Sequence, residues 1–242
     1  MISENIKVSY SEQYDDSSIA WRMQGARYKA QNIVNICKGR TFERVLEVGA
    51  GEGSILKCLS DWEFGVHLHG IEISESGIEM IRKKQIARLK EVLLFDGYQI
   101  PYPDAYFDLV ICSHVMEHVE HERLLLREIK RVSKQQIFEV PIDFSFYVDR
   151  KIKHFLDYGH INIYTPALFR FLLKSEHFSI EKDCCYHYEN AMLEQIFKGN
   201  RKALLMAKLK RFVLKKIPYL GGIKPNSYVV LTSADEGSLH IF

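Results

Sequence analysis

The sequence predicts a doubly wound α/β fold: a mostly parallel sheet of seven strands with helices on both faces and the last strand antiparallel. Short apolar runs rich in β-branched residues alternate with segments of helical periodicity, which is typical of βαβ units. The stretch Phe107–Cys112 is almost wholly apolar, as expected for a central parallel strand that is buried on both faces. A chain of 242 residues is long enough for one well-buried domain of this class.

The expected elements follow one another in a regular order. Strands are expected at Arg44–Val48, His67–Ile73, Val92–Phe95, Phe107–Cys112, Gln136–Val140, Phe178–Cys184 and Tyr228–Thr232. Helices are expected at Ser54–Leu59, Arg123–Val132 and Pro166–Ser175. A further helix follows the second strand, with apolar residues from Ile78 to Ile86 near helical spacing and a cap at Ser74 or Ser76.

The segment from Val45 to Gly53 runs from a strand through a glycine-rich turn into a helix. Glycines there let the backbone approach a ligand closely and place amides at a helix N-terminus. A dinucleotide-binding enzyme uses the same device, but its GxGxxG pattern requires a third glycine where this chain has Ser54. Glu47 precedes the first glycine by two residues, where it would repel a pyrophosphate and attract an amino group. The sequence therefore disfavours NAD and favours S-adenosylmethionine.

A second acid stands at the end of the second expected strand. Glu72 follows the glycine turn by about twenty residues, a position from which a carboxylate can accept both hydroxyls of a ribose. Ile73, beside it, can stack on adenine.

These motifs, in this order, resemble the class I S-adenosylmethionine-dependent methyltransferases, in particular the branch that acts on small molecules. Phe95–Gly97, followed by Ile100–Tyr102, is similar to the family segment whose acid meets the adenine amino group. Ser113–Val119 resembles the segment after the fourth strand that lines the methyl-transfer site. Gly159–Thr165 resembles a later recurrent segment, so the resemblance covers roughly Glu43–Phe178.

The resemblance implies that the chain binds S-adenosylmethionine and releases S-adenosylhomocysteine. The residues expected to contact this cofactor are Glu47, Gly49, Ala50, Gly51, Glu72, Ile73, Asp96, Gly97 and Ser113. For Asp96 an alternative stays open: its side chain can instead cap the turn at Gly97. Asp108 is expected to have a structural role.

The N-terminal segment looks like the helical lead-in that closes over the cofactor in related proteins. Tyr14 would then cover the cofactor, and Arg22 or Arg27 would meet the methionine carboxylate. The alternative is a surface helix that packs Trp21 and Tyr28 on the domain.

Methyl transfer needs an acceptor lone pair aligned with the methyl–sulfur bond, and an oxygen or nitrogen acceptor often needs a base. His114 and His118 follow the fourth strand one helical turn apart, and His160 lies in the later motif. These three histidines are the candidate catalytic residues, with a structural role as the alternative for each. No metal site is expected, although His121 extends the series, because Glu117 and His118 are adjacent and would point in different directions on a helix.

One domain is expected, with residues 1–40 as a lead-in or cap and residues 41–142 as the cofactor-binding core. Residues 143–160 and 186–225 are expected to be insertions over the acceptor site, rich enough in aromatic residues to form a lid. Residues 198–216 carry eight basic residues and no acid. They are interpreted as a partly buried lid helix, or as a contact with an anionic membrane or a phosphorylated substrate.

Composition limits the choice of partner and compartment. The formal net charge is only +2, and no Asn/Asp-Pro-Pro-aromatic motif is seen, so nucleic acid is not the expected partner. The five cysteines form no CxxC pair, the first residues do not resemble a signal peptide, and no apolar run reaches membrane-spanning length. We therefore expect a cytoplasmic methyltransferase with a small-molecule acceptor, for which an anionic, lipid-linked or sugar metabolite would be suitable. The alternative is a non-catalytic subunit or sensor that binds S-adenosylmethionine.

Overall fold

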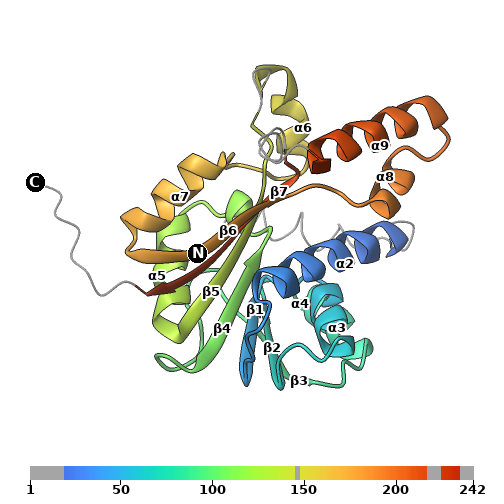
Figure 1. Ribbon diagram of the computed structural model, residues 1–242. Helices are drawn as coiled ribbons and strands as arrows, with labels where there is room; N and C mark the ends of the chain where they lie inside the picture. Colours follow the sequence, from blue (N-terminus) through green and yellow to red (C-terminus); the bar gives the residue numbers. More distant parts are fainter. Residues whose placement is uncertain (1–18, 145–147, 217–224, 235–242) are drawn as a thin grey trace, which may run out of the picture.

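The computed structural model describes residues 19–144, 148–216 and 225–234, and these contain one mixed sheet. Its strands are β1 (Arg44–Val48), β2 (His67–Glu72), β3 (Leu89–Leu94), β4 (Phe107–Ser113), β5 (Ser133–Pro141), β6 (Phe178–Tyr186) and β7 (Ser227–Ala234). Their order across the sheet is β3-β2-β1-β4-β5-β7-β6 (Figure 1). The predicted seven-stranded α/β fold is confirmed.

Strands β1 to β5 pair in parallel, whereas β7 runs antiparallel to both of its neighbours, β5 and β6. The antiparallel last strand is therefore also confirmed. The chain order reverses between β1 and β4, and in open α/β sheets ligands bind in the crevice outside the carboxyl ends of the strands at such a point.

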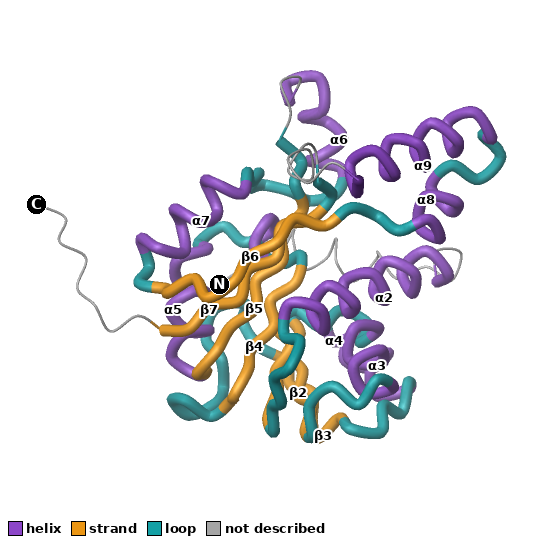
Figure 2. The backbone as a smooth tube through the Cα atoms, viewed as in Figure 1, coloured by secondary structure: helices purple, strands orange, loops and turns teal. Residues whose placement is uncertain are grey.

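Helices cover both faces of the sheet (Figure 2). The helices α2 (Ile19–Ile36), α3 (Ser54–Asp61) and α4 (Glu75–Lys83) lie on one face. The helices α5 (Glu122–Val132) and α7 (Pro166–Ser175) lie on the other. The strand residues alternate accordingly: Val45 packs with the first group of helices and Leu46 with the second.

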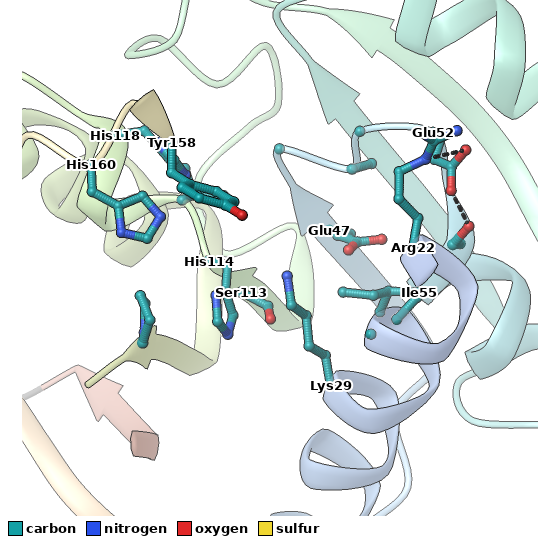
Figure 3. Close-up of a pocket in the computed structure, with 18 of the residues that line it drawn as sticks. Arg22, Lys29, Glu47, Glu52, Ile55, Ser113, His114, His118, Tyr158 and His160 are labelled. Atoms are coloured by element: carbon teal, nitrogen blue, oxygen red, sulfur yellow. Dashed lines mark hydrogen bonds and ion pairs between the residues drawn. The ribbon is translucent and has the colours of Figure 1, made fainter. Parts of the chain in front are cut away.

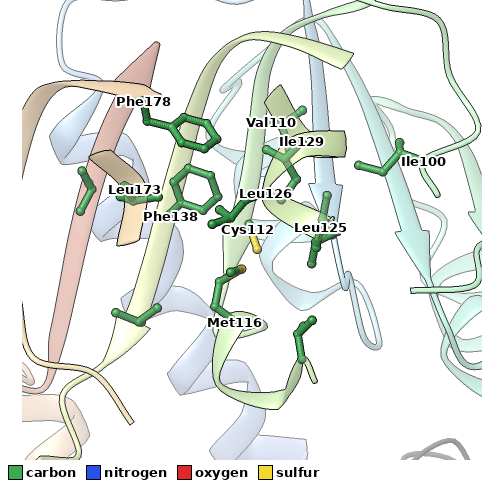
Figure 4. Close-up of a cluster of buried hydrophobic side chains, with 14 of the residues drawn as sticks. Ile100, Val110, Cys112, Met116, Leu125, Leu126, Ile129, Phe138, Leu173 and Phe178 are labelled. Atoms are coloured by element: carbon green, nitrogen blue, oxygen red, sulfur yellow. The ribbon is translucent and has the colours of Figure 1, made fainter. Parts of the chain in front are cut away.

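The core between α5, α7 and the sheet is fully buried (Figure 4). Leu126 and Ile129 of α5 face Val110 and Phe138 of the central strands, and none of these four side chains is exposed to solvent. Burying each such side chain contributes about 1.5–3 kcal/mol to stability. This packing fixes α5 and the turn that precedes it, which carries candidate site residues.

Local capping explains where two helices begin. Ser74 Oγ accepts a hydrogen bond from the Gly77 amide and is the N-cap of α4, whereas Ser76 lies inside the helix with its hydroxyl 2.7 Å from that of Ser74. At α7, Thr165 accepts from the Leu168 amide, and Pro166 occupies the first turn. Of the two serines that the sequence allowed as a cap, Ser74 is the N-cap of α4.

Several element boundaries differ from the sequence expectation by a few residues, among them those of α4 and β3. α4 ends at Lys83, so the buried Ile86 lies in the turn after the helix rather than within it. β3 begins at Leu89 because its pairing with Leu68 of β2 extends the strand toward its N-terminus. Neither difference moves a candidate site residue.

Further helices stand at the carboxyl edge of the parallel strands (Figure 1). They are the 3-10 helices η2 (Met116–His118) and η3 (Val148–Lys151), and the α-helices α6 (Ile152–Asp157), α8 (Asn190–Ile196) and α9 (Arg201–Lys216). The last four lie within the two segments expected to be insertions. Among the described helices, none has both the length and the apolar character needed to cross a membrane.

Candidate active site

A cavity of about 590 Å³ opens at the carboxyl ends of the parallel strands (Figure 3). It begins at Glu47 and the glycine turn after β1, passes the end of β2, and continues along the end of β4. Its far part is lined by residues of the later segments, among them Phe155, Tyr158 and Tyr188. The volume is within the usual range of small-molecule pockets, about 300–1,000 Å³.

The glycine turn has the backbone conformation that its residues permit. Gly49, Gly51 and Gly53 all have positive φ angles, of 67°, 56° and 78°. A Cβ atom on Gly49 would lie 2.6 Å from Cγ2 of Val115. The turn therefore requires glycine at this position both for its φ angle and for the close approach of the segment after β4. Ala50 also lines the cavity.

The Glu47 carboxylate is buried at the cavity wall, with only 2% of the residue exposed, and its Oε2 has no hydrogen-bond partner in the described structure. Burial raises the pKa of this carboxyl to about 8, against the opposing charge of Lys29. A buried acid without a partner for one oxygen is costly. It fits a cationic amino group arriving from the cavity, which is the chemistry expected of the methionine end of the cofactor.

Glu72 is also buried and is held by backbone amides. Its Oε2 accepts from the Gly51 amide at 2.7 Å, and its Oε1 accepts from the amides of Ile73 and Ser74 at 2.9 and 3.1 Å. Burial raises the pKa of Glu72, and these three hydrogen bonds oppose the shift. A carboxylate has about four acceptor positions, so three are filled within the protein and about one remains for a ribose hydroxyl. Ile73 lies beside it and lines the cavity.

Asp96 takes the capping position that was its alternative interpretation. Its Oδ1 accepts from the amides of Tyr98 and Gln99 at 2.9 and 2.7 Å, and these bonds lower its pKa although partial burial opposes them. The side chain is exposed, whereas its neighbours Phe95 and Gly97 line the cavity. The contact of Asp96 with adenine stays a prediction.

Asp108 has the structural role expected for it. Its Oδ2 accepts from the amides of Glu43 and Arg44, and its Oδ1 pairs with Lys134 at 2.8 Å. The carboxylate therefore joins the starts of β1 and β5 through β4.

Ser113 ends β4 and lines the cavity with its hydroxyl already engaged. Its Oγ donates to Oε2 of Glu139 at 2.8 Å, and Asn32 of α2 donates to the other oxygen of the same carboxylate, also at 2.8 Å. Glu139 is fully buried. This network fixes α2 against the strand ends, so any cofactor contact of Ser113 must use its remaining acceptor capacity or its backbone.

The lead-in helix α2 brings Arg22 to the cavity wall, where its Nε lies 3.4 Å from Oε2 of Glu52 in the glycine turn. Lys84 contacts the same oxygen at 3.4 Å. Arg27 points elsewhere, with its guanidinium over the Trp62 ring at 5.8 Å. Of the two arginines, the structure places only Arg22 at the cavity. Tyr14 lies outside the described residues.

His114 has a backbone geometry that the sequence did not predict. Its φ angle is +56°, in the left-handed region, so no continuous helix joins it to His118 and the expected helical turn between them is wrong. Its Nδ1 lies 3.4 Å from Oε1 of Glu117, and its Nε2 is buried with no hydrogen-bond partner in the part of the chain that the structure describes. His114 lines the cavity and stays the candidate base.

His118 and His160 come together from distant parts of the chain, with their ring centroids 4.9 Å apart. The Nδ1 of His118 lies 2.9 Å from the Gly159 carbonyl oxygen, and the Nδ1 of His160 lies 2.7 Å from Oδ2 of Asp143. Both rings line the cavity.

The segment after Gly159 is fixed by backbone hydrogen bonds. The amides of Ile161 and Asn162 donate to the Glu117 carbonyl, and the Asn162 side chain donates to the carbonyls of Met116 and Val119. These bonds hold the later motif against the η2 turn and place His160 beside His118.

The expectation that Glu117 and His118 point in different directions is wrong. Because η2 is a 3-10 turn, Oε1 of Glu117 lies 3.8 Å from Nε2 of the adjacent His118 instead of pointing away from it. His121 stays apart from this group: it is the N-cap residue of α5 and contacts Tyr98.

Some cavity residues were missed in the sequence. Lys29 follows Arg22 by seven residues on the same helix face, and that spacing could have identified it. Figure 3 shows its amino group directed into the cavity between Glu47 and His114. Asp143 follows β5 by two residues, a position where polar side chains in this fold often line the site.

The fold and the motifs can now be compared with known proteins. A family model described as a methyltransferase domain matches residues 46–136. This match begins within β1, contains β2 to β4, and includes most of the residues at the near end of the cavity. This part of the chain is therefore similar to a methyltransferase domain.

Curated relatives of this chain are distant in sequence. A ubiquinone/menaquinone biosynthesis C-methyltransferase, UbiE, from Paraburkholderia xenovorans is 28% identical over 129 residues, which cover 51% of this chain and 53% of the relative. The methyltransferase YrhH of Bacillus subtilis, itself assigned provisionally, is 26% identical over 135 residues, covering 53% of this chain and 71% of the relative. The chain thus spans about half the length of the UbiE relatives.

Solved structures share the fold over nearly the whole chain. A SAM-dependent methyltransferase from Archaeoglobus fulgidus superposes with a TM-score of 0.58 at 22% identity, covering 89% of this chain and 97% of that one. A chain from the complex between the Haloferax volcanii Trm112 methyltransferase activator and a proposed methyltransferase gives a TM-score of 0.67 at 12% identity, covering 98% and 100%. The described residues therefore have the class I, Rossmann-like methyltransferase fold.

Proposed function

We propose that this chain is an enzyme that transfers the methyl group of S-adenosylmethionine to a small-molecule acceptor. One observation supports this most directly: a single cavity connects the buried carboxylates at the ends of β1 and β2 with the histidines after β4. A cofactor at the first end and an acceptor at the second would meet within this one cavity.

The residues at the near end fit the cofactor. Glu47 would hold the amino group, Glu72 a ribose hydroxyl, and the turn from Gly49 to Gly51 would lie against the nucleoside or methionine chain. When bound, S-adenosylmethionine supplies an electrophilic methyl group on a sulfonium. The protein's task is then to orient the two reactants and exclude water.

The far end suits an acceptor of moderate size. Phe155, Tyr158 and Tyr188 supply aromatic surface, and Asp143 and His160 supply polar groups. His114, with Nδ1 facing Glu117 and Nε2 without a partner among the described residues, is the proposed base for an acceptor that must lose a proton. The aromatic lining and the name of the UbiE relatives both favour an acceptor with an apolar or lipid-soluble part.

The first test is calorimetric titration of the purified chain with S-adenosylmethionine, S-adenosylhomocysteine and NAD in parallel. Saturable binding of the first two with none of the third supports the proposal, and binding of NAD alone overturns it. Transfer of labelled methyl groups to a panel of small acceptors then tests catalysis. Binding of the cofactor with no transfer to any acceptor would instead favour the non-catalytic sensor.

We further propose that α9 contacts anionic membrane, which would give access to a lipid-soluble acceptor. Five large apolar side chains of this helix are exposed: Leu205, Met206, Leu209, Phe212 and Val213. Exposed lysines, such as Lys202 and Lys210, flank them. Apolar and basic side chains together on one exposed helix are typical of an interfacial membrane contact.

Sedimentation with lipid vesicles tests this contact. We expect binding to vesicles that contain anionic phospholipid, weaker binding to neutral vesicles, and loss of binding in Phe212→Glu. Phe171→Glu, at an exposed phenylalanine of α7, is the matched control and should still bind. Equal sedimentation of both variants, or no binding by the unaltered chain, would contradict the proposal.

A further inference from the structure

We propose that Glu117, His118 and His160 form a binding site for a divalent first-row transition metal ion, Zn²⁺ in particular, at the acceptor end of the cavity. The potential ligand atoms of these three residues all lie within 4.8 Å of one another. Glu117 Oε1 and His118 Nε2 are already 3.8 Å apart. Ligands at about 2.0–2.1 Å from a tetrahedral ion are about 3.3 Å apart, so small side-chain movements would complete the set.

Glu117 is the strongest indication of a bound cation. It is fully buried, and neither of its carboxylate oxygens has a hydrogen-bond partner of good geometry in the described structure. The ring nitrogens His114 Nδ1 and His118 Nε2 lie 3.4 and 3.8 Å from its Oε1. A buried carboxylate in its charged form is costly unless a cation compensates it.

The two histidines are oriented as metal ligands are. A carbonyl oxygen can only accept, so the contact of His118 Nδ1 with the Gly159 carbonyl places the proton on Nδ1 and leaves a lone pair on Nε2. His160 contacts Asp143 through Nδ1 at 2.7 Å in the same way. Metal-binding histidines almost always donate their second ring N–H to a carbonyl or a carboxylate, which fixes the tautomer and the ring orientation.

The donor set indicates the class of ion. Two imidazole nitrogens and one carboxylate suit Zn²⁺ and its first-row neighbours, whereas Mg²⁺ and Ca²⁺ prefer oxygen ligands throughout. Three protein ligands leave at least one coordination position open, which is the arrangement of catalytic sites rather than closed structural ones. His118 and His160 line the cavity, so an open position would face it.

This site would also narrow the acceptor class, an extension that rests on the proposed function. An acceptor oxygen could occupy the open position, and a bound metal lowers the pKa of a coordinated hydroxyl. We therefore infer an acceptor that carries a hydroxyl group.

The experiment uses the full chain, treated with a chelator and then dialysed. Titration with Zn²⁺ in calorimetry should show one high-affinity equivalent, and Co²⁺ should give the visible absorption of nitrogen and oxygen ligation. Mg²⁺ at the same concentration should not displace Zn²⁺. His118→Ala and His160→Ala should each weaken Zn²⁺ binding at least about 100-fold, and Asp143→Asn should weaken it about 10–100-fold.

A matched control separates this site from adventitious histidine binding. His154 also lines the cavity but lies outside the cluster, so His154→Ala should bind Zn²⁺ like the unaltered chain. No stoichiometric binding by the unaltered chain, or an equal loss in His154→Ala and His118→Ala, would overturn the proposal.

Binding of S-adenosylhomocysteine is measured on every variant. It reports folding, and it keeps the two proposals apart. Normal cofactor binding without metal binding would refute only the metal site, whereas metal binding without cofactor binding would refute only the proposed function.

Discussion

The amide of Gly51 donates a hydrogen bond of 2.7 Å to Oε2 of Glu72, and this bond ties the glycine turn after β1 to the end of β2. Glu72 thus shapes the wall of the cavity as well as facing it. Changes at Glu72 should consequently alter the turn and the ligand together.

Glu72→Gln should lower both stability and cofactor affinity. In the unaltered protein, three backbone amides donate to the Glu72 carboxylate. Glutamine keeps the size of the side chain, but its NH₂ group cannot accept a hydrogen bond from any of these amides. Leaving a buried donor unpaired costs about 1–3 kcal/mol. Chemical denaturation and titration with S-adenosylhomocysteine measure the two effects. Unchanged stability would show that the three hydrogen bonds contribute little.

Gly49→Ala should disrupt the cofactor turn. The added methyl would lie 2.6 Å from Val115 Cγ2, and the φ angle of +67° disfavours any side chain. We expect at least about tenfold weaker cofactor binding. The double variant Gly49→Ala with Val115→Ala removes the contact but retains the backbone strain, so it should recover affinity only in part. Full recovery would show that strain at Gly49 is negligible.

Glu47→Gln should make the unliganded protein more stable at high pH and weaken its cofactor binding. The carboxyl has a pKa of about 8 when folded, against an ordinary value of 4.5. Between these values the folded chain keeps a proton that the unfolded chain has lost, so stability falls as pH rises through this range. The slope from Glu47 is up to about 1.4 kcal/mol per pH unit.

Urea denaturation of the unaltered chain and of Glu47→Gln, at several pH values between 4.5 and 8, measures this difference. Glutamine cannot ionise, so the variant should lack the decline. Cofactor binding below pH 8 should also release a proton, which calorimetry in buffers of different ionisation enthalpy detects. Parallel stability curves for the two proteins would refute the raised pKa.

Arg22→Ala should weaken ligands that carry the methionine carboxylate and spare those that do not. We expect about a tenfold loss for S-adenosylhomocysteine and no loss for methylthioadenosine, which lacks the amino-acid end. Lys29→Ala, on the same helix, is the comparison that identifies which cation holds the carboxylate. Equal losses for both ligands would instead indicate that Arg22 acts through its ion pair with Glu52.

His114→Ala should lower turnover about 10²- to 10⁴-fold, the usual contribution of a general base, without weakening cofactor binding. Methyl transfer to the acceptor found in the screen, together with titration of S-adenosylhomocysteine, measures both quantities. Unchanged turnover would remove His114 as the base.

The fold was largely predictable because its determinants are local. Alternating apolar periodicity defines the strands and helices, and the glycine turn with Glu47 identifies the end of β1. Parallel strands bring their carboxyl ends to one edge, so the sequence order alone indicated that Glu47, Glu72 and Ser113 would line the same cavity. The roles of these residues in binding stay predictions.

The acid and histidine cluster could not be predicted in this way. Glu117 and His160 are more than forty residues apart, and backbone bonds from Ile161 and Asn162 to the η2 turn bring them together. The left-handed φ of His114 and the 3-10 turn η2 belong to the segment after β4 against which Ile161 and Asn162 lie. The sequence by itself determined the order of the strands along the chain, the glycine turn and the acids at the strand ends, because each depends on neighbouring residues. Only the tertiary structure decided which histidines meet Glu117, because that depends on hydrogen bonds between distant segments.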